Sequence, residues 1–175
     1  MKRGPKIFGY EPGWLWWAAA LVVVGLGVFF SIKLLERKQF NDAYIDELIV
    51  HHAQQQGLDV ALVRSVVEAE SGGDWLAESP VGAKGLMQIT EIAQEDVQQR
   101  FDIDDGDLYD PDYNLRVGTL YLGYLLERFD GDVRLAVTAY HMGPTAVEEG
   151  RDPGPQNRAY VQKVMELYEA SSNAE

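Results

Sequence analysis

The sequence predicts an all-α protein, with one compact helical body preceded by one N-terminal transmembrane helix. From about residue 41 onward, apolar residues recur at helical spacing, and no alternating segment is long enough for a convincing strand. Before that point, residues 14–32 form an uncharged apolar run. The 175 residues are enough for one domain with a small appendage, and no internal repeat divides them.

The apolar run WLWWAAALVVVGLGVFFSI covers residues 14–32. As a helix it would extend about 28 Å, close to the thickness of the hydrocarbon core of a bilayer. Three tryptophans crowd its first end, where indole rings favour the membrane interface, and no small-x-small cleavage site follows it. We therefore expect an uncleaved signal-anchor rather than a cleaved signal peptide. Basic residues flank both ends, so charge alone does not orient the segment.

Most of the helices predicted for the body begin at capping residues or end at glycines. They cover about residues 41–56, 60–70, 91–99, 111–129, 133–143 and 157–170. Their predicted N-caps are Asp59, Thr90, Asp110 and Asp132, and their predicted stops are Gly57, Gly131 and Gly143. Pro111 occupies the first position of its helix, where its missing N–H costs nothing. The stretches between the helices are predicted as loops that feed a cleft.

Composition excludes several classes of function. The chain has no cysteine, which rules out disulfides and Cys-ligated metals. Its formal net charge of −13 is divided unevenly, because residues 1–40 carry +4 and the remainder −17. A body this acidic is a poor partner for nucleic acid, and we expect none.

Two further features are weak candidates for a metal site. The acidic loop FDIDDGDLYD lacks calcium-loop spacing, because counting back from Gly106 puts Phe101 at the first ligand position. His51 and His52 are adjacent, so they point to different sides of a helix, and we expect both at the surface. We expect no metal and no cofactor.

Two glutamates at the end of the helix predicted for residues 60–70 should differ in environment. The positions one and two turns before Glu70 are all apolar: Val67, Val66, Val63 and Leu62. Glu68 lies on the mixed face, with Arg64 one turn back as an ion partner. Glu70 should therefore be partly desolvated at a helix C-terminus, and both effects raise its pKa. A carboxylic acid that keeps its proton near neutrality can serve as a general acid.

The alternative for Glu70 is a helix-end carboxylate that turns back to solvent. The pattern alone leaves both open. The following glycines Gly72, Gly73, Gly82 and Gly85 let backbone approach a ligand, which favours an elongated substrate over the solvent alternative.

Three segments resemble one known family in order and with fitting spacing. ESGGDWLAESPVGAKGLMQI at residues 70–89 resembles the signature of SLT-type lytic transglycosylases, goose-type lysozyme-like enzymes of peptidoglycan cleavage. Residues 109–144, ending in AYHMGP, resemble the family's helix pair, and NRAYVQKVMELY at residues 157–168 resembles its closing Arg-x-Tyr-Val helix. The resemblance covers about residues 57–168 and implies a lysozyme-like helical domain with a substrate cleft.

The resemblance also implies roles for single residues. Glu70 falls on the family's catalytic acid/base. Ser79 and Gln88 fall on cleft residues that position the carboxyl or the sugar. Tyr140 falls on the tyrosine whose hydroxyl approaches the catalytic carboxyl, and His141 stands where an asparagine is usual.

The chain departs from the family pattern at three places. His141-Met142 replaces Asn-Ala, Thr90-Glu91 replaces Met-Pro, and Gln156 replaces a glutamate. These positions concern substrate contacts and leave the implied reaction class intact. His141 could tune Glu70, touch the glycan, or fill the asparagine position by size and hydrogen bonding.

The implied activity is lytic cleavage of the β-1,4 bond between N-acetylmuramic acid and N-acetylglucosamine, with Glu70 as single acid/base and a 1,6-anhydro product. One alternative is a lysozyme-type hydrolase in which Asp74 or Glu78 activates water. Another is a non-catalytic glycan-binding scaffold.

Peptidoglycan as partner would place the body outside the cytoplasmic membrane and the N-terminus inside, with the lipid bilayer bound through residues 14–32. Roles in wall turnover and in an envelope-spanning assembly both stay open. The expected segments are a cytoplasmic N-terminus at 1–13, the anchor at 14–32, a tether and first helix at 33–56, the transglycosylase domain at 57–170 and a frayed C-terminus at 171–175.

Overall fold

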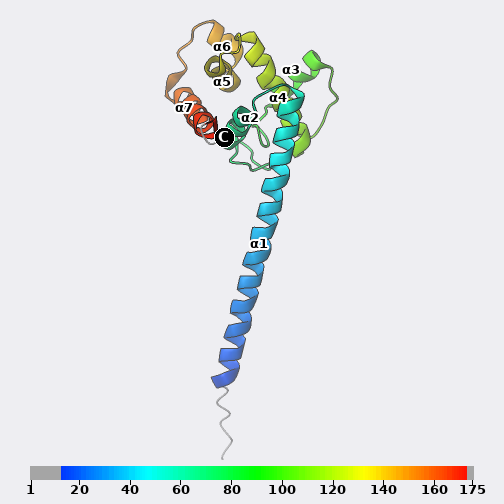
Figure 1. Cartoon of the computed structure of the whole chain (residues 1–175), viewed down its shortest axis with the longest axis vertical. Coiled ribbons are helices and arrows are strands. Elements are labelled where there is room, and N and C mark those ends of the chain that lie inside the picture. Colours follow the sequence, from blue (N-terminus) through cyan, green and yellow to red (C-terminus); the bar gives the residue numbers. More distant parts are fainter. Residues whose placement is uncertain (1–12, 173–175) are drawn as a thin grey trace, which may run out of the picture. The chain divides into compact units, whose positions relative to one another are not determined.

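The computed structural model describes the chain from residue 13 to residue 172 (Figure 1). Side chains are described from residue 42 onward and at some positions of residues 21–32. The described elements are the helices α1 (Gly13–Gln55), α2 (Val60–Glu70), α3 (Glu91–Phe101), α4 (Pro111–Arg128), α5 (Val133–Met142), α6 (Pro144–Glu148) and α7 (Gly154–Ser172). Between residues 13 and 172 the β pairings are isolated bridges in the loop after α2, so the all-α prediction is confirmed.

The chain divides into two units, one ending at Asn41 and one beginning at Asp42. The first unit contains the predicted anchor, whose backbone belongs to α1. More than half of the side chains of residues 14–32, and those of residues 33–41, lie outside the described residues, as do the whole of residues 1–12 and 173–175. Among the described residues, no helix has the length and apolar character needed to span a bilayer.

The predicted caps of the body are confirmed. The Asp59 carboxylate accepts a hydrogen bond of 2.8 Å from the Ala61 N–H, and the Thr90 hydroxyl accepts one from the Ala93 N–H. Asp110 and Asp132 cap α4 and α5 in the same way. Each cap satisfies an N–H group that the first helical turn leaves unpaired.

Two features of the C-terminal half differ from the prediction. α7 begins at Gly154, three residues before the predicted start, and α6 was not predicted. α6 has five residues and starts with Pro144, directly after Gly143 at φ +86°. A helix this short has no complete apolar repeat, so periodicity cannot detect it.

The core of the body surrounds α2. α2 packs along α7, and α5 packs against both α4 and α7 (Figure 1). The fully buried side chains Val63, Val66, Leu86, Met87 and Leu122 bring α2, the following loop and α4 into one apolar cluster. The C-terminal end of α2 is therefore held from several sides, which fixes the position of its last residue.

The prediction for His52 is wrong. His51 is exposed, but His52 is 3% exposed, and its Nε2 lies 2.9 Å from Oδ1 of Asp112 at the start of α4. Adjacent helical residues point about 100° apart, so one of the pair can face the core while the other faces water. The sequence pattern does not say which one.

Candidate active site

Glu70 is the last residue of α2, and the buried face of that helix is the one predicted. Leu62, Val63, Val66 and Val67 are all buried, Glu70 is half-buried, and Glu68 is exposed. The two glutamates therefore differ as expected. The predicted partner of Glu68 is wrong, because Arg64 pairs instead with Asp46 of α1, at 2.7 Å.

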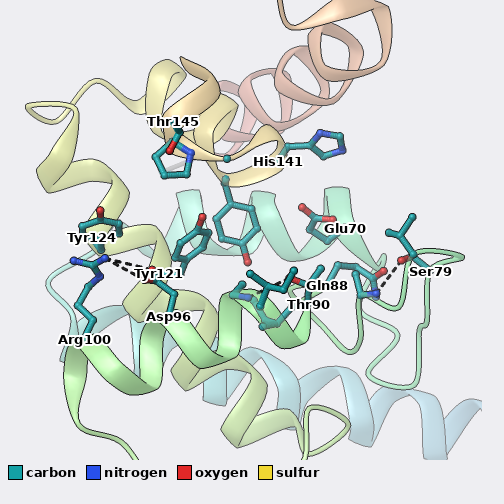
Figure 2. Close-up of a pocket in the computed structure, with 18 of the residues that line it drawn as sticks. Glu70, Ser79, Gln88, Thr90, Asp96, Arg100, Tyr121, Tyr124, His141 and Thr145 are labelled. Atoms are coloured by element: carbon teal, nitrogen blue, oxygen red, sulfur yellow. Dashed lines mark hydrogen bonds and ion pairs between the residues drawn. The ribbon is translucent and has the colours of Figure 1, made fainter. Parts of the chain in front are cut away.

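A cavity of about 700 Å³ opens beside Glu70. All five residues singled out from the sequence line it: Glu70, Ser79, Gln88, Tyr140 and His141. Figure 2 shows Glu70 and Ser79 toward one end of this cleft and Arg100 with Tyr124 at the other. The five predicted residues, which lie up to 71 positions apart in the chain, thus share one cleft.

The pKa of Glu70 is raised from 4.5 to about 7. Burial is the largest cause, since it disfavours the charged carboxylate. The Tyr160 hydroxyl and the positive charge of Lys163 act in the opposite direction and lower the pKa. The predicted rise is confirmed. A carboxyl with this pKa exchanges a proton readily in either direction at neutral pH.

The Tyr140 hydroxyl donates a hydrogen bond of 2.8 Å to the Met87 carbonyl. This bond ties α5 to the loop that follows α2, beside the cleft. Burial and the nearby Glu70 both raise the pKa of Tyr140, so its hydroxyl stays protonated. Tyr140 therefore adjoins Glu70, while its hydroxyl hydrogen-bonds the backbone.

Ser79 and Gln88 shape the loop between α2 and α3. The Ser79 hydroxyl accepts a hydrogen bond from the Ala83 N–H at 3.0 Å, which closes a tight turn. Gln88 has φ +48° and donates from its carboxamide to the carbonyls of Ala77 and Gly85. Both side chains line the cleft and also hold its wall in place.

The buried Asn114 side chain of α4 holds the same loop by hydrogen bonds to its backbone. Its carboxamide donates to the Lys84 and Leu108 carbonyls and accepts from the Met87 N–H, at 2.8 to 2.9 Å. A polar group buried with all these partners costs little and specifies one loop conformation.

The transglycosylase SLT domain family model matches residues 47–158 of this chain. The chain belongs to the SLT transglycosylase family. Its curated relatives include the soluble lytic murein transglycosylase of Salmonella typhimurium, 31% identical over 136 residues, covering 75% of this chain and 20% of that protein. They also include membrane-bound lytic murein transglycosylase E of Buchnera aphidicola, 33% identical over 123 residues, covering 62% of this chain and 56% of that protein.

A solved structure of similar fold is that of an inactive variant of the lytic transglycosylase Slt from Pseudomonas aeruginosa. It matches with a TM-score of 0.67 and 29% identity, covering 73% of this chain and 24% of that chain. The lysozyme-like SLT fold expected for the body is thus confirmed. The chain spans about a fifth of the length of the Salmonella relative.

In this SLT domain, Tyr160 of α7 was not predicted as a site residue. Its hydroxyl is buried, lies close enough to Glu70 to lower that carboxyl's pKa, and makes no hydrogen bond of ordinary geometry with any residue from 42 to 172. Its ring stacks on that of His141, which also contacts the Asn157 side chain. The Arg-x-Tyr-Val motif contains Tyr160, so the signal was present.

A second group that the sequence reasoning missed lines the far end of the cleft. Arg100 of α3 lies 3.9 Å above the ring of Tyr124 and pairs with Asp96. Arg128 of α4 makes a bidentate ion pair with Glu148, in which both N–H···O hydrogen bonds are 2.7 Å long. No motif links these residues, because they come from α3, α4 and α6 and meet only in the fold.

The carboxylates considered for a hydrolytic mechanism do not line the cleft. Asp74 accepts from the Leu76 N–H, and Glu78 accepts a hydrogen bond of 2.7 Å from the Tyr109 hydroxyl. Besides Glu70, the carboxylate that lines the cavity is Asp96. Figure 2 shows Asp96 near Arg100, with Tyr121 between it and Glu70. Among the described residues, no cluster of three or more histidines and acids is arranged to hold a metal ion.

Proposed function

We propose that the body is a peptidoglycan lytic transglycosylase with Glu70 as its single acid/base. The observation that carries the proposal is a carboxyl with a pKa of about 7 on the wall of a cleft of about 700 Å³. Membership of the SLT family supports it, as does the lytic murein transglycosylase named among the relatives. Tyrosine rings at Tyr121, Tyr124 and Tyr140 give the cleft flat apolar surfaces that suit sugar rings.

In the proposed reaction, Glu70 first gives its proton to the oxygen that bridges muramoyl C1 and the next glucosaminyl residue. The C1–O bond breaks, and the substrate's own acetamido group relieves the positive charge on C1. Glu70 is now anionic and takes the proton from the muramoyl 6-hydroxyl. That oxygen bonds to C1, closes the 1,6-anhydro ring and leaves Glu70 protonated again.

This sequence needs one group that acts as acid and then as base, and a pKa near the working pH serves both steps. A lysozyme-type hydrolase would need a second carboxylate across the scissile bond. The side chains of Asp74 and Glu78 are engaged elsewhere, and Asp96 is paired with Arg100. The single-carboxylate mechanism is therefore favoured.

Digestion of purified sacculi tests the proposal. The wild-type body should release muropeptides that are one water lighter than hydrolysis products, and Glu70→Gln should release none. Glu68→Gln is the matched control, because Glu68 is exposed on the same helix, and it should digest like wild type. Products of hydrolytic mass would favour the lysozyme alternative, and binding without release of fragments would favour the scaffold.

We further propose that residues 14–32 anchor the protein in the cytoplasmic membrane, with the body on the extracytoplasmic side. The described apolar side chains Leu21, Val23, Val24, Leu26, Val28, Phe29 and Ile32 are all exposed. The Buchnera relative is named membrane-bound, which agrees with this placement, whereas the Salmonella relative is named soluble. Carbonate extraction of membranes tests it: the full chain should stay in the pellet, and a chain lacking residues 1–40 should not.

A further inference from the structure

Lys163 of α7 reaches the end of α2 that carries Glu70. Its ammonium group donates hydrogen bonds to the Glu68 carbonyl at 3.1 Å and to the Ala69 carbonyl at 3.0 Å. The last carbonyls of a helix have no partner within the helix and carry its partial negative charge. A cation from another helix thus covers the two carbonyls that immediately precede Glu70.

We propose that Lys163 is a positioning residue for Glu70: it holds the C-terminal end of α2 in place and supplies the positive charge that Glu70 meets when it ionises. This inference rests on the proposed function, in which Glu70 must become anionic between the two proton transfers. Without a cation nearby, the buried carboxylate would face the negative end of its own helix alone.

Lys163 acts among several titratable groups that adjoin Glu70 or share its cleft. α7 also contributes the Tyr160 hydroxyl, which lowers the pKa of Glu70 as Lys163 does. α5 contributes the neutral hydroxyl of Tyr140 and the exposed ring of His141, and α3 contributes Asp96 to the shared cleft. The positive charge that acts on Glu70 from this set is that of Lys163.

Lys163 does not line the cleft, but its contact joins α7 to the end of α2 that carries Glu70. α2 packs along α7, and the buried Val161 and Val164 of α7 belong to the same core cluster as the apolar face of α2. Because Lys163 lies between these two core residues in sequence, its backbone is fixed and its side chain can reach the helix end. A displacement of α7 would therefore move both the charge and the carboxyl.

Three variants separate the charge from the hydrogen bonds. Lys163→Met removes both, Lys163→Gln keeps an N–H donor without charge, and Lys163→Arg keeps both. Arg116→Met is the control, because Arg116 is an exposed cation of α4 that does not line the cleft. The readout is the titration of the Glu70 carboxyl carbon by NMR in the full chain, together with the pH profile of digestion.

We expect the pKa of Glu70 to rise by about half a unit in Lys163→Met and Lys163→Gln, because Lys163 is exposed and its charge is partly screened. Lys163→Arg and Arg116→Met should titrate like wild type. The difference between Lys163→Gln and wild type should shrink in about 1 M salt, where screening is strong. The alkaline limb of the digestion profile should move with the pKa.

An unchanged Glu70 titration in a folded Lys163→Gln protein would overturn the inference. If Lys163→Met fails to fold, Lys163→Gln still decides, since it preserves a donor to the two carbonyls. The proposed function has a separate test: it is wrong if the wild-type protein releases no anhydro product from sacculi. The NMR titration does not depend on that outcome.

Discussion

The His141 ring lies stacked on the Tyr160 ring, with the two centroids 4.3 Å apart and the planes inclined by 28°. His141 lines the cleft, whereas the Tyr160 hydroxyl is buried next to Glu70. The cleft surface and the buried surroundings of the carboxyl are thus in direct contact through two rings from α5 and α7.

Tyr160→Phe should move the titration of Glu70 upward from about 7, because the hydroxyl that lowers its pKa is removed and the apolar ring remains. The alkaline limb of the pH profile of digestion should shift to higher pH by the same amount. Tyr168→Phe is the control, since its hydroxyl bonds to Asp59 away from the cleft. A profile that shifts downward in Tyr160→Phe would contradict the assignment.

Glu70→Gln should make the protein more stable at alkaline pH. The native state keeps the Glu70 proton between about pH 4.5 and about 7, where an unfolded chain has already lost it. Wild-type stability therefore falls through that window, by about 3 kcal/mol in total at 1.4 kcal/mol per pKa unit. A neutral amide avoids this loss.

Urea unfolding of both proteins at pH 4 and pH 8 measures the effect. The difference in unfolding free energy between Glu70→Gln and wild type should grow by up to about 3 kcal/mol from the lower to the higher pH. A difference that is the same at both pH values would mean that Glu70 is hydrated and titrates normally.

His141→Asn should cost about 1 kcal/mol of stability, because the stack on Tyr160 is lost. An asparagine can still hydrogen-bond the Asn157 side chain that His141 now contacts, so α5 and α7 should stay joined. Digestion should persist, since the change restores the residue usual in the family. Abolished activity in a stable variant would instead assign His141 a direct contact with the glycan.

Gly85→Ala should destabilise the body by at least about 3 kcal/mol. Gly85 has φ +75°, and an added Cβ would lie 2.3 Å from the Asn114 side-chain nitrogen and 2.4 Å from the Leu108 carbonyl oxygen. Gly57→Ala is a matched control, with φ +65° and open space around its Cβ, and should cost about 1 kcal/mol. Thermal unfolding compares them, and equal losses would show that backbone strain alone is responsible.

Much of the fold could be predicted from local sequence. The N-caps depend on one side chain and the N–H groups two or three residues later, so Asp59 and Thr90 could be assigned without the fold. Helical geometry within eleven residues puts Glu70 on the apolar face of α2, although the pattern alone left a turn back to solvent open. The resemblance placed Ser79, Gln88, Tyr140 and His141, and all of them line the cleft.

The rest depended on contacts between helices that are distant in the chain. Arg64 forms its ion pair with Asp46 rather than with Glu68, and the buried His52 contacts Asp112. Packing between helices decides which of several nearby partners a side chain reaches. Lys163 lies more than 90 positions from the carbonyls it covers, and no periodicity encodes that pairing.

Local sequence was enough to predict the longer helices, their N-caps and the apolar face that carries Glu70, because backbone hydrogen bonding and side-chain spacing act within a turn or two. Only the packed structure brings up the two groups that lower the pKa of Glu70, which are the Tyr160 hydroxyl and the Lys163 ammonium. These act through space and exist only once α7 has packed along α2.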